Sequence, residues 1–240
     1  MKIIAFNGSP KGKKSSTSIM VENFLKGAES KKAITEQFFL KDKKIHHCIG
    51  CFHCWFKTPG KCIFKDDMDE LIEKFISADI VIFATPLYVD NVTGLMKNFM
   101  DRQLPMAEPY FEKDEKNNTR HPLRSKKIAS FVIISNCGFP EENNFEVLSH
   151  IFQRVARNGH TKVIAEIYKS QGPLLNTPDP NLKPIINEYK KNLQIAGAEI
   201  VENQTLSENT KKSLKKPFLD PDLYTQLVHE HFDKELRKKE

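Results

Sequence analysis

The sequence predicts an α/β fold: a doubly wound, five-stranded parallel sheet with helices on both faces. Two observations predict it. Apolar runs without polar alternation, which are typical of strands buried on both faces, recur along about 200 residues. Each run is followed by a segment whose apolar residues repeat at helical spacing. Alternating strands and helices indicate a parallel sheet in which the helices form the crossovers.

The first half of the chain supplies three of these strands. The run KIIAF is apolar throughout and ends at the turn signal NGSP, so it predicts a buried strand over residues 2–6. The next strands are expected at 33–40 and 79–86, and helices at 17–28, 66–78 and 91–102. Asp67 is expected to cap the second helix, with Glu70 three residues later as its capping-box partner.

The second half repeats the pattern after an interruption. Residues 103–126 are rich in Pro, Asn and charge, and long excursions of this kind inside compact domains are often functional. Strands follow at 127–135 and 162–168, and helices at 145–156 and 184–197, with Gly197 expected to end the last helix. We therefore expect one domain over 1–205. A C-terminal extension over 206–240 would contain a helix from Leu223 that packs on the domain or on a second subunit.

Composition narrows the class of protein. No apolar run is as long as a membrane span, and the opening MKIIAF is too short for a signal peptide. We therefore expect a cytoplasmic protein without a membrane partner. The net charge of +6 comes from scattered lysines, without an arginine-rich stripe that alternates with aromatics, so no nucleic-acid partner is expected. In the cytoplasm, clustered cysteines more often bind metal or do redox chemistry than form disulfides.

In an open parallel sheet, ligands bind at the carboxyl ends of the strands, where three loops are chemically unusual. The first, over residues 7–17, has the spacing of neither a P-loop nor a dinucleotide-binding loop. It is rich in hydroxyls and opens a helix, and this combination suits a phosphomonoester. The hydroxyls are those of Ser9, Ser15, Ser16, Thr17 and Ser18. The alternative is a capped helix that follows a flexible surface loop.

The second and third loops follow the strands at 79–86 and 127–135. The second offers a rigid proline, apolar and aromatic side chains that could pack on a flat cofactor, and an amide for its polar ring atoms. The third stands where a further contact would come. The residues concerned are Pro86, Leu87, Tyr88, Asn91, Asn136 and Gly138. The alternative for the second loop is core packing with an Asn cap on the next helix.

The stretch CIGCFHCWFKTPGKC, residues 48–62, holds four of the five cysteines at the spacing C-x2-C-x2-C-x7-C. Ferredoxins use C-x2-C-x2-C for three corners of an iron–sulfur cluster, and the KTPGK turn can return a fourth cysteine to close it. The candidate ligands are Cys48, Cys51, Cys54 and Cys62. Two alternatives stay open: an unligated thiol loop, or a zinc ion with help from His46, His47 or His53.

Together these motifs carry a resemblance. G-S-P-K after the first strand, P-x-Y after the third and K-x-F-x-D-R in the next helix resemble the flavodoxin-like NAD(P)H-dependent FMN reductase family, over roughly residues 1–200. The cysteine loop makes the chain similar to the iron-sulfur flavoproteins of anaerobes within it. Two departures are that Lys11 stands where Arg is common and Ser16 where Asn is usual.

The resemblance implies a set of contacts. It implies that the FMN phosphate lies on Ser9, Ser16 and Thr17 with Lys11, and that the isoalloxazine ring lies against Pro86, Leu87, Tyr88 and Asn91. It also implies one [4Fe-4S] cluster per chain, and paired subunits that let cluster and flavin exchange electrons. We name no acid–base catalyst, because a flavin needs none for hydride transfer.

The sequence thus predicts an FMN-dependent oxidoreductase that passes electrons from FMN to a [4Fe-4S] cluster or an acceptor. NAD(P)H is one possible donor and reduced ferredoxin another. Expected partners are a small-molecule redox substrate or a ferredoxin-like protein, and a second copy of the chain in a homodimer or homotetramer. The alternatives are an NAD(P)H-dependent FMN or quinone reductase with an unligated cysteine loop, a non-enzymatic flavin electron carrier, and a flavin-free zinc protein.

Overall fold

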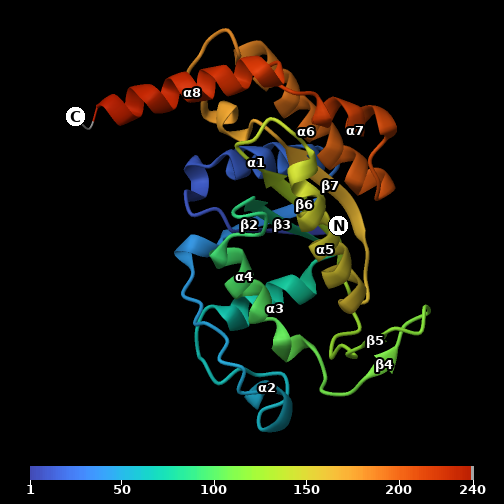
Figure 1. Ribbon diagram of the computed structural model, residues 1–240. Coiled ribbons are helices and arrows are strands. Elements are labelled where there is room, and N and C mark those ends of the chain that lie inside the picture. Colours follow the sequence, from blue (N-terminus) through green and yellow to red (C-terminus); the bar gives the residue numbers. More distant parts are fainter. Residues whose placement is uncertain (239–240) are drawn as a thin grey trace.

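The computed structural model describes residues 1–238 and is built around one five-stranded sheet (Figure 1). Its strands are β1 (Lys2–Asn7), β2 (Ile34–Phe39), β3 (Ile80–Pro86), β6 (Ser130–Asn136) and β7 (Val163–Lys169). They lie in the order β2-β1-β3-β6-β7, and every neighbouring pair is parallel. This is the flavodoxin-like strand order, so the predicted fold class is confirmed.

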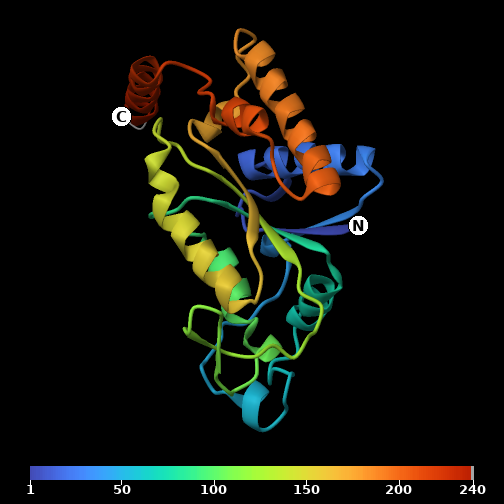
Figure 2. The same cartoon turned by 90° about the vertical axis from the view of Figure 1, so that its right-hand side faces the viewer.

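Helices cover both faces of the sheet (Figure 2). On one face, α1 (Ser16–Ser30) and α6 (Lys183–Asn203) pack over a core of buried aliphatic residues. On the other face, α3 (Met68–Ser77), α4 (Gly94–Asp101) and α5 (Glu146–Asn158) cover a core that is rich in phenylalanine. The central strand β3 is buried at every residue, which explains its uninterrupted apolar sequence.

Helices α1 and α6 approach each other through two glycines, and this corrects one prediction. Gly197 does not end its helix, because α6 continues to Asn203. A Cβ atom on Gly197 would lie 1.9 Å from the carbonyl oxygen of Phe24, and one on Gly27 would lie 1.8 Å from that of Gln194. The close contact between two backbones therefore explains Gly197 better than a helix stop does.

The start of α3 corrects a second prediction. Asp67 precedes the helix, but its side chain makes no capping bond. Instead Asp66 Oδ1 accepts from the N–H of Met68 at 3.1 Å, while Asp67 Oδ2 accepts from the N–H of Lys44 at 2.7 Å. The two carboxylates thus tie the chain before the cysteine loop to the helix after it, and the predicted capping box is wrong.

The cysteine loop and the excursion lie together at one end of the molecule (Figure 1). The loop contains the short helix α2 (His53–Phe56), and the excursion contains an antiparallel hairpin of β4 (Glu112–Lys113) and β5 (Thr119–Arg120). Short 3-10 helices complete the connections at Gly12–Lys14, Leu40–Asp42, Leu104–Met106, Asn143–Phe145 and Gly172–Asn176.

The C-terminal residues form α7 (Glu208–Lys215), which the sequence did not predict, and α8 (Pro221–Arg237), which projects from the body (Figure 1). Between them the chain is held by Gln171, whose Oε1 accepts from the N–H groups of Phe218 and Leu219 at 2.9 and 3.0 Å. The division of the chain at residue 206 into a domain and an extension stays a prediction. The end of the predicted C-terminal helix, beyond residue 238, lies outside the described residues. None of the described helices has the length and apolarity of a bilayer span.

Candidate functional site

The loop between β1 and α1 uses part of its hydroxyl set to build the start of the helix. Ser15 is the N-cap residue: its Oγ accepts from the N–H of Ser18 at 3.0 Å and donates to the carbonyl of Gly12 at 2.6 Å. The hydroxyl of Ser18 donates to Glu22 within the helix, at 2.8 Å. Ser15 and Ser18 are therefore buried and help to shape the start of the helix, while their predicted contact with a phosphate stays a prediction.

The other predicted phosphate contacts lie around the same helix start. Ser9 and Thr17 are buried, Ser16 is half-buried and Lys11 is exposed. The N–H groups of Ser16 and Thr17 belong to the first turn of α1, where a helix supplies no carbonyl partner. A helix N-terminus also carries a partial positive charge, so this turn can hold a phosphate.

Two hydrogen bonds join the three loops at the carboxyl ends of β1, β3 and β6. Thr93, the N-cap of α4, donates from Oγ1 to the carbonyl of Gly8 at 2.7 Å. Asn136 donates from Nδ2 to Thr17 Oγ1 at 2.8 Å, across 119 residues of sequence. The structure thus brings the predicted residues of the first and third loops into direct contact. Gly138, two residues beyond, is exposed.

The second loop turns sharply at the edge of the sheet. Pro86 and Leu87 are buried, and the N–H of Leu87 donates to the carbonyl of Asn136 at 2.9 Å. Tyr88 and Asn91 exchange backbone hydrogen bonds of 2.9 and 3.1 Å around a two-residue turn. The turn leaves the Tyr88 ring 48% exposed beside the other loops, which suits a residue that covers a flat ligand.

The four predicted thiols line one small pocket beneath α4. Cys54 is buried, Cys62 is half-buried, and Cys48 and Cys51 are exposed at its mouth. Burial raises the pKa of the Cys54 thiol, and the neighbouring Cys62, Cys51 and Cys48 raise it further. Within residues 1–238, no group of three or more His, Cys, Asp or Glu side chains is already arranged as a metal site.

The pocket fits a thiolate-bound group by its donors and less well by its present size. Four cysteines are a ligand set for zinc or an iron–sulfur cluster, and apolar side chains such as Ile49 and Phe64 line the rest of the wall. The cavity holds about 20 Å³, roughly the space of one water molecule. Binding of a cluster would therefore require the loop to rearrange.

Arg102 also lines this pocket, and the sequence reasoning missed it as a site residue. Its side chain is 1% exposed and pairs with Asp66 through two bonds, Nη1–Oδ2 at 2.8 Å and Nη2–Oδ1 at 3.1 Å. Burial opposes ionisation of Asp66, but the bonds from Arg102 and His46 outweigh it and hold the pKa of Asp66 well below its usual range. The sequence did carry a signal for its burial, because Arg102, the C-cap residue of α4, lies three residues after the buried Phe99.

Aromatic rings connect the cysteine loop with the hairpin. Trp55 donates from Nε1 to the carbonyl of Leu104 at 3.2 Å, and its ring lies 5.1 Å from that of Phe52 and 4.9 Å from that of His121. His121 also contacts the exposed Phe111, at 5.1 Å. This side of the cysteine pocket is therefore walled by the excursion that the sequence marked as a long insertion.

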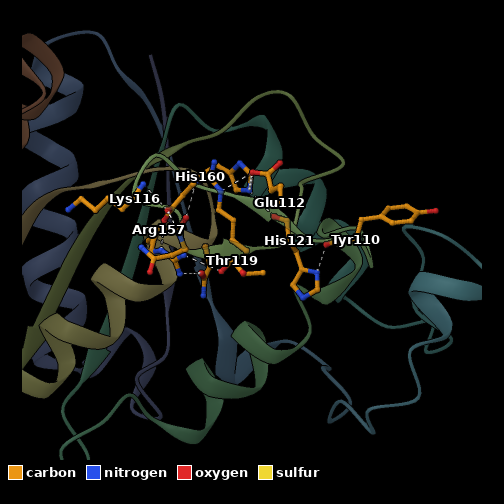
Figure 3. Close-up of polar contacts among 11 residues, drawn as sticks. Tyr110, Glu112, Lys116, Thr119, His121, Arg157 and His160 are labelled. Carbon is orange, nitrogen blue, oxygen red and sulfur yellow. Dashed lines mark hydrogen bonds and ion pairs between the residues drawn. The ribbon is translucent and has the colours of Figure 1, made fainter.

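Figure 3 shows what holds that excursion in place. Arg157, near the end of α5, donates to Asp114 Oδ2 at 2.7 Å and to the carbonyl of Thr119 at 3.1 Å. The Nε2 atom of His160 lies 2.8 Å from the carbonyl of His121, the residue that directly follows β5. The hairpin is thus fastened to the body of the molecule, which keeps His121 against the cysteine loop.

A comparison with protein families decides the relationship. The sequence model described as NADPH-dependent FMN reductase matches residues 1–152. The chain belongs to the NADPH-dependent FMN reductase family. The predicted resemblance is confirmed at this level, and the matched residues include the first two loops, the cysteine loop and Asn136.

Curated relatives point to one branch of the FMN reductase family. An iron-sulfur flavoprotein of Archaeoglobus fulgidus is 37% identical over 142 residues, which cover 59% of this chain and 58% of the relative. One of Methanocaldococcus jannaschii is 42% identical over 102 residues, covering 42% of this chain and 50% of the relative. The chain therefore spans about half the length of the curated relatives it matches.

Solved structures share the fold at low sequence identity. An FMN-dependent NADH-azoreductase from Bacillus anthracis, in complex with FMN, gives a TM-score of 0.57 at 17% identity and covers 83% of this chain and 99% of its own. An NAD(P)H:quinone oxidoreductase from Methanothermobacter marburgensis gives a TM-score of 0.59 at 15% identity. The match covers 83% of this chain and 96% of that protein. At these identities the likeness establishes the fold alone.

Proposed function

We propose that this FMN reductase family member is an FMN-dependent oxidoreductase. One observation carries the proposal: the loops after β1, β3 and β6 are joined by hydrogen bonds at the carboxyl edge of the sheet, the place where open α/β folds bind ligands. Bound FMN would supply the redox chemistry, taking a hydride or electrons from NAD(P)H or another reduced donor and passing them on.

The chain's own part would be to hold and orient the cofactor. We assign its phosphate to the first turn of α1, with the N–H groups and hydroxyls of Ser16 and Thr17, and with Ser9 and Lys11 alongside. The isoalloxazine ring would lie against Pro86, Leu87, Tyr88 and Asn91. Asn136 and Gly138 would supply further contacts from the third loop. Asn136 would act twice, because its amide also orients the Thr17 hydroxyl.

We further propose that the cysteine pocket binds a [4Fe-4S] cluster, to which electrons pass from FMN. The support is that four thiols line one pocket and that relatives at 37% and 42% identity are named iron-sulfur flavoproteins. A second candidate is a reductase of small molecules whose cysteine loop is unligated, and the small present volume of the pocket favours it. We expect a homodimer or homotetramer in either case.

The test is to purify the protein without oxygen, record its visible spectrum and count FMN, iron and sulfide per chain. The proposal expects one FMN with about four irons and four sulfides. Flavin without iron would refute the cluster and support the simple reductase. Protein that stays colourless after addition of FMN would refute both.

Two cysteine variants localise the cluster. Cys62→Ser should abolish iron binding and leave FMN bound, because Cys62 lines the pocket and none of the residues assigned to FMN does. Cys137→Ser is the matched control: it removes a buried thiol outside the pocket and should leave the iron content unchanged. Equal loss of iron in both variants would contradict the assignment.

A further inference from the structure

We propose that Arg102 is a positioning residue of the cysteine pocket, supplying a fixed positive charge and an N–H donor to the anionic group that the thiolates hold. The inference rests on the proposed function to the extent that the four cysteines bind a metal ion or cluster. It gives a role to a residue at the end of α4. Neither the cysteine spacing nor the resemblance of the flavin loops gives that residue a role.

The first argument is the position of the guanidinium. Arg102 is the largest side chain that is fully buried in the described protein, and it lines the same pocket as the four thiols. Beside the two bonds to Asp66, its Nη1 donates to the carbonyl of His46 at 2.7 Å. Three bonds to two separate segments leave the planar group little freedom to turn.

The second argument is the hydrogen bond that is missing. The Nε atom of Arg102 is buried and has no hydrogen-bond acceptor among the residues that the structure describes. A buried donor without a partner is costly, so it is uncommon unless a ligand supplies the acceptor. Besides Arg102, the polar side chains that line the pocket are the four thiols and Asp101, which pairs with Lys97. A metal-bound thiolate or sulfide is therefore the acceptor that fits.

The third argument is charge. An arginine side chain stays protonated in proteins, so the buried guanidinium of Arg102 brings a positive charge to the wall of the pocket. Four thiolates around one divalent ion carry about two negative charges in excess. Asp66 neutralises Arg102 while the thiols are protonated. When a metal ion replaces the thiol protons, Arg102 is the buried cation that lines the pocket, whereas Lys169, the other buried cation of the described residues, lies outside it.

The competing explanation is purely structural: Arg102 would serve only to hold Asp66 and His46, and so the chain on both sides of the loop. The two explanations predict different effects of the two substitutions on metal affinity. Removal of either partner breaks the same ion pair, so a structural role predicts that both losses weaken metal binding. A charge role predicts opposite effects, because one variant removes a positive charge beside the pocket and the other removes a negative one.

The experiment compares Arg102→Met with Asp66→Asn. Metal-free protein is titrated without oxygen with Co²⁺ at one fixed pH, and the thiolate-to-cobalt absorption reports binding without any flavin or cluster activity. We expect Arg102→Met to weaken Co²⁺ binding at least about tenfold and Asp66→Asn to strengthen it or leave it unchanged. Lys31→Met is the control, because it also breaks a cation–carboxylate pair, with Glu202, but lies outside the pocket.

Reconstituted protein gives a second readout. A positive charge stabilises the more negative, reduced state, so Arg102→Met should lower the midpoint potential by about 59 mV for each tenfold change in a one-electron equilibrium. Asp66→Asn should raise the potential. Arg102→Lys keeps the charge but loses the planar donors, so it should fall between wild type and Arg102→Met.

The outcomes distinguish failure of the Arg102 role from failure of the cluster proposal on which it rests. If wild type binds Co²⁺ and iron but Asp66→Asn weakens binding as Arg102→Met does, the role of Arg102 is structural and the inference is overturned alone. Asp66→Asn decides this even if Arg102→Met does not fold. If wild-type protein binds neither metal, the cluster proposal fails and this inference fails with it.

Discussion

At the scale of single residues, the turn after β3 contains a backbone conformation that its side chain disfavours. Val89 has φ of +48° and is 97% exposed, and Asp90 follows with φ of +56°. Positive φ is unfavourable for β-branched residues, and no packing on the Val89 side chain compensates for it. Strain of this kind often persists where a site needs a particular geometry, here the turn that presents Tyr88.

Replacement of Val89 tests whether that strain is real. Val89→Asn should raise the free energy of unfolding by about 1 kcal/mol, because Asn tolerates the left-handed conformation and is favoured in two-residue turns of this form. Urea denaturation measures the change. Val147→Asn, at an exposed position in α5 with ordinary helical geometry, is the control and should not stabilise. An unchanged midpoint for Val89→Asn would contradict the strain.

Lys169 is the second unusual residue, a cation with no exposed surface at the end of β7. It donates to the carbonyl of Lys216 and lies against the Phe218 ring, with Nζ 4.0 Å from the ring centre. Burial lowers its pKa to about 8, against a partial opposing effect of Glu142. The folded state therefore releases this proton at a lower pH than the unfolded chain does.

That difference predicts a pH dependence of stability. Between about pH 8 and the usual lysine pKa near 10.4, the unfolded chain binds more protons at this site, so the contribution of Lys169 to stability rises with pH. The expected rise is at most about 3 kcal/mol, because each pKa unit of difference between the two states corresponds to about 1.4 kcal/mol. Urea unfolding of wild type and Lys169→Met across this range measures it. Parallel curves for the two proteins would refute the prediction.

At the scale of elements, the sequence predicted the strands whose burial sets their local composition. It did not predict features that depend on contacts between segments far apart in the sequence. The strands β1, β3 and β6 are apolar because both faces of the sheet are covered, and that signal is local. Helix α7 is polar at all but a few positions and buries only Thr210 and Leu214, so it left no periodic signal. Gly197 was wrongly predicted to end its helix, because the helix that packs on it lies about 170 residues away in the sequence.

The contact between α1 and α6 gives an element-scale prediction. Gly197→Ala should lower the free energy of unfolding by about 1–3 kcal/mol, although alanine favours helices, because the new methyl group meets the backbone carbonyl of Phe24 and the two helices must separate. Chemical denaturation measures the loss. Gly94→Ala, where the methyl group meets nothing within 4 Å, is the control and should be neutral. Stabilisation by Gly197→Ala would contradict the packing.

At the scale of the whole molecule, the sheet topology located the candidate site before any contact was known. Three loops at the carboxyl edge followed from strand order, and the shared pocket of the cysteines is consistent with their close spacing. The bonds that join the loops, Thr93 to Gly8 and Asn136 to Thr17, could not be read from the sequence. They depend on how distant segments meet after folding, as does the burial of Arg102.

The projecting helix α8 makes a prediction about assembly. Leu227, Phe232 and Leu236 are 44–65% exposed on it, and apolar groups gathered on one projecting element usually mark a contact surface. We expect Phe232→Glu with Leu236→Glu to reduce the oligomer to smaller species in light scattering, while FMN content stays the same. Thr225→Glu, also exposed on α8, should leave the mass unchanged. A monomeric wild type would refute the prediction.

The first turn of α8 also reaches the proposed flavin site. Tyr224 donates from Oη to the carbonyl of Gly138 at 2.7 Å, so the last helix is anchored on the loop that follows β6. Shortening the chain before α8, a natural step for anyone who wants a more compact variant, would remove that anchor. Such a truncation cuts into the support of the cofactor loop as well as into the surface, and its flavin affinity should be compared with that of the full chain before any other property.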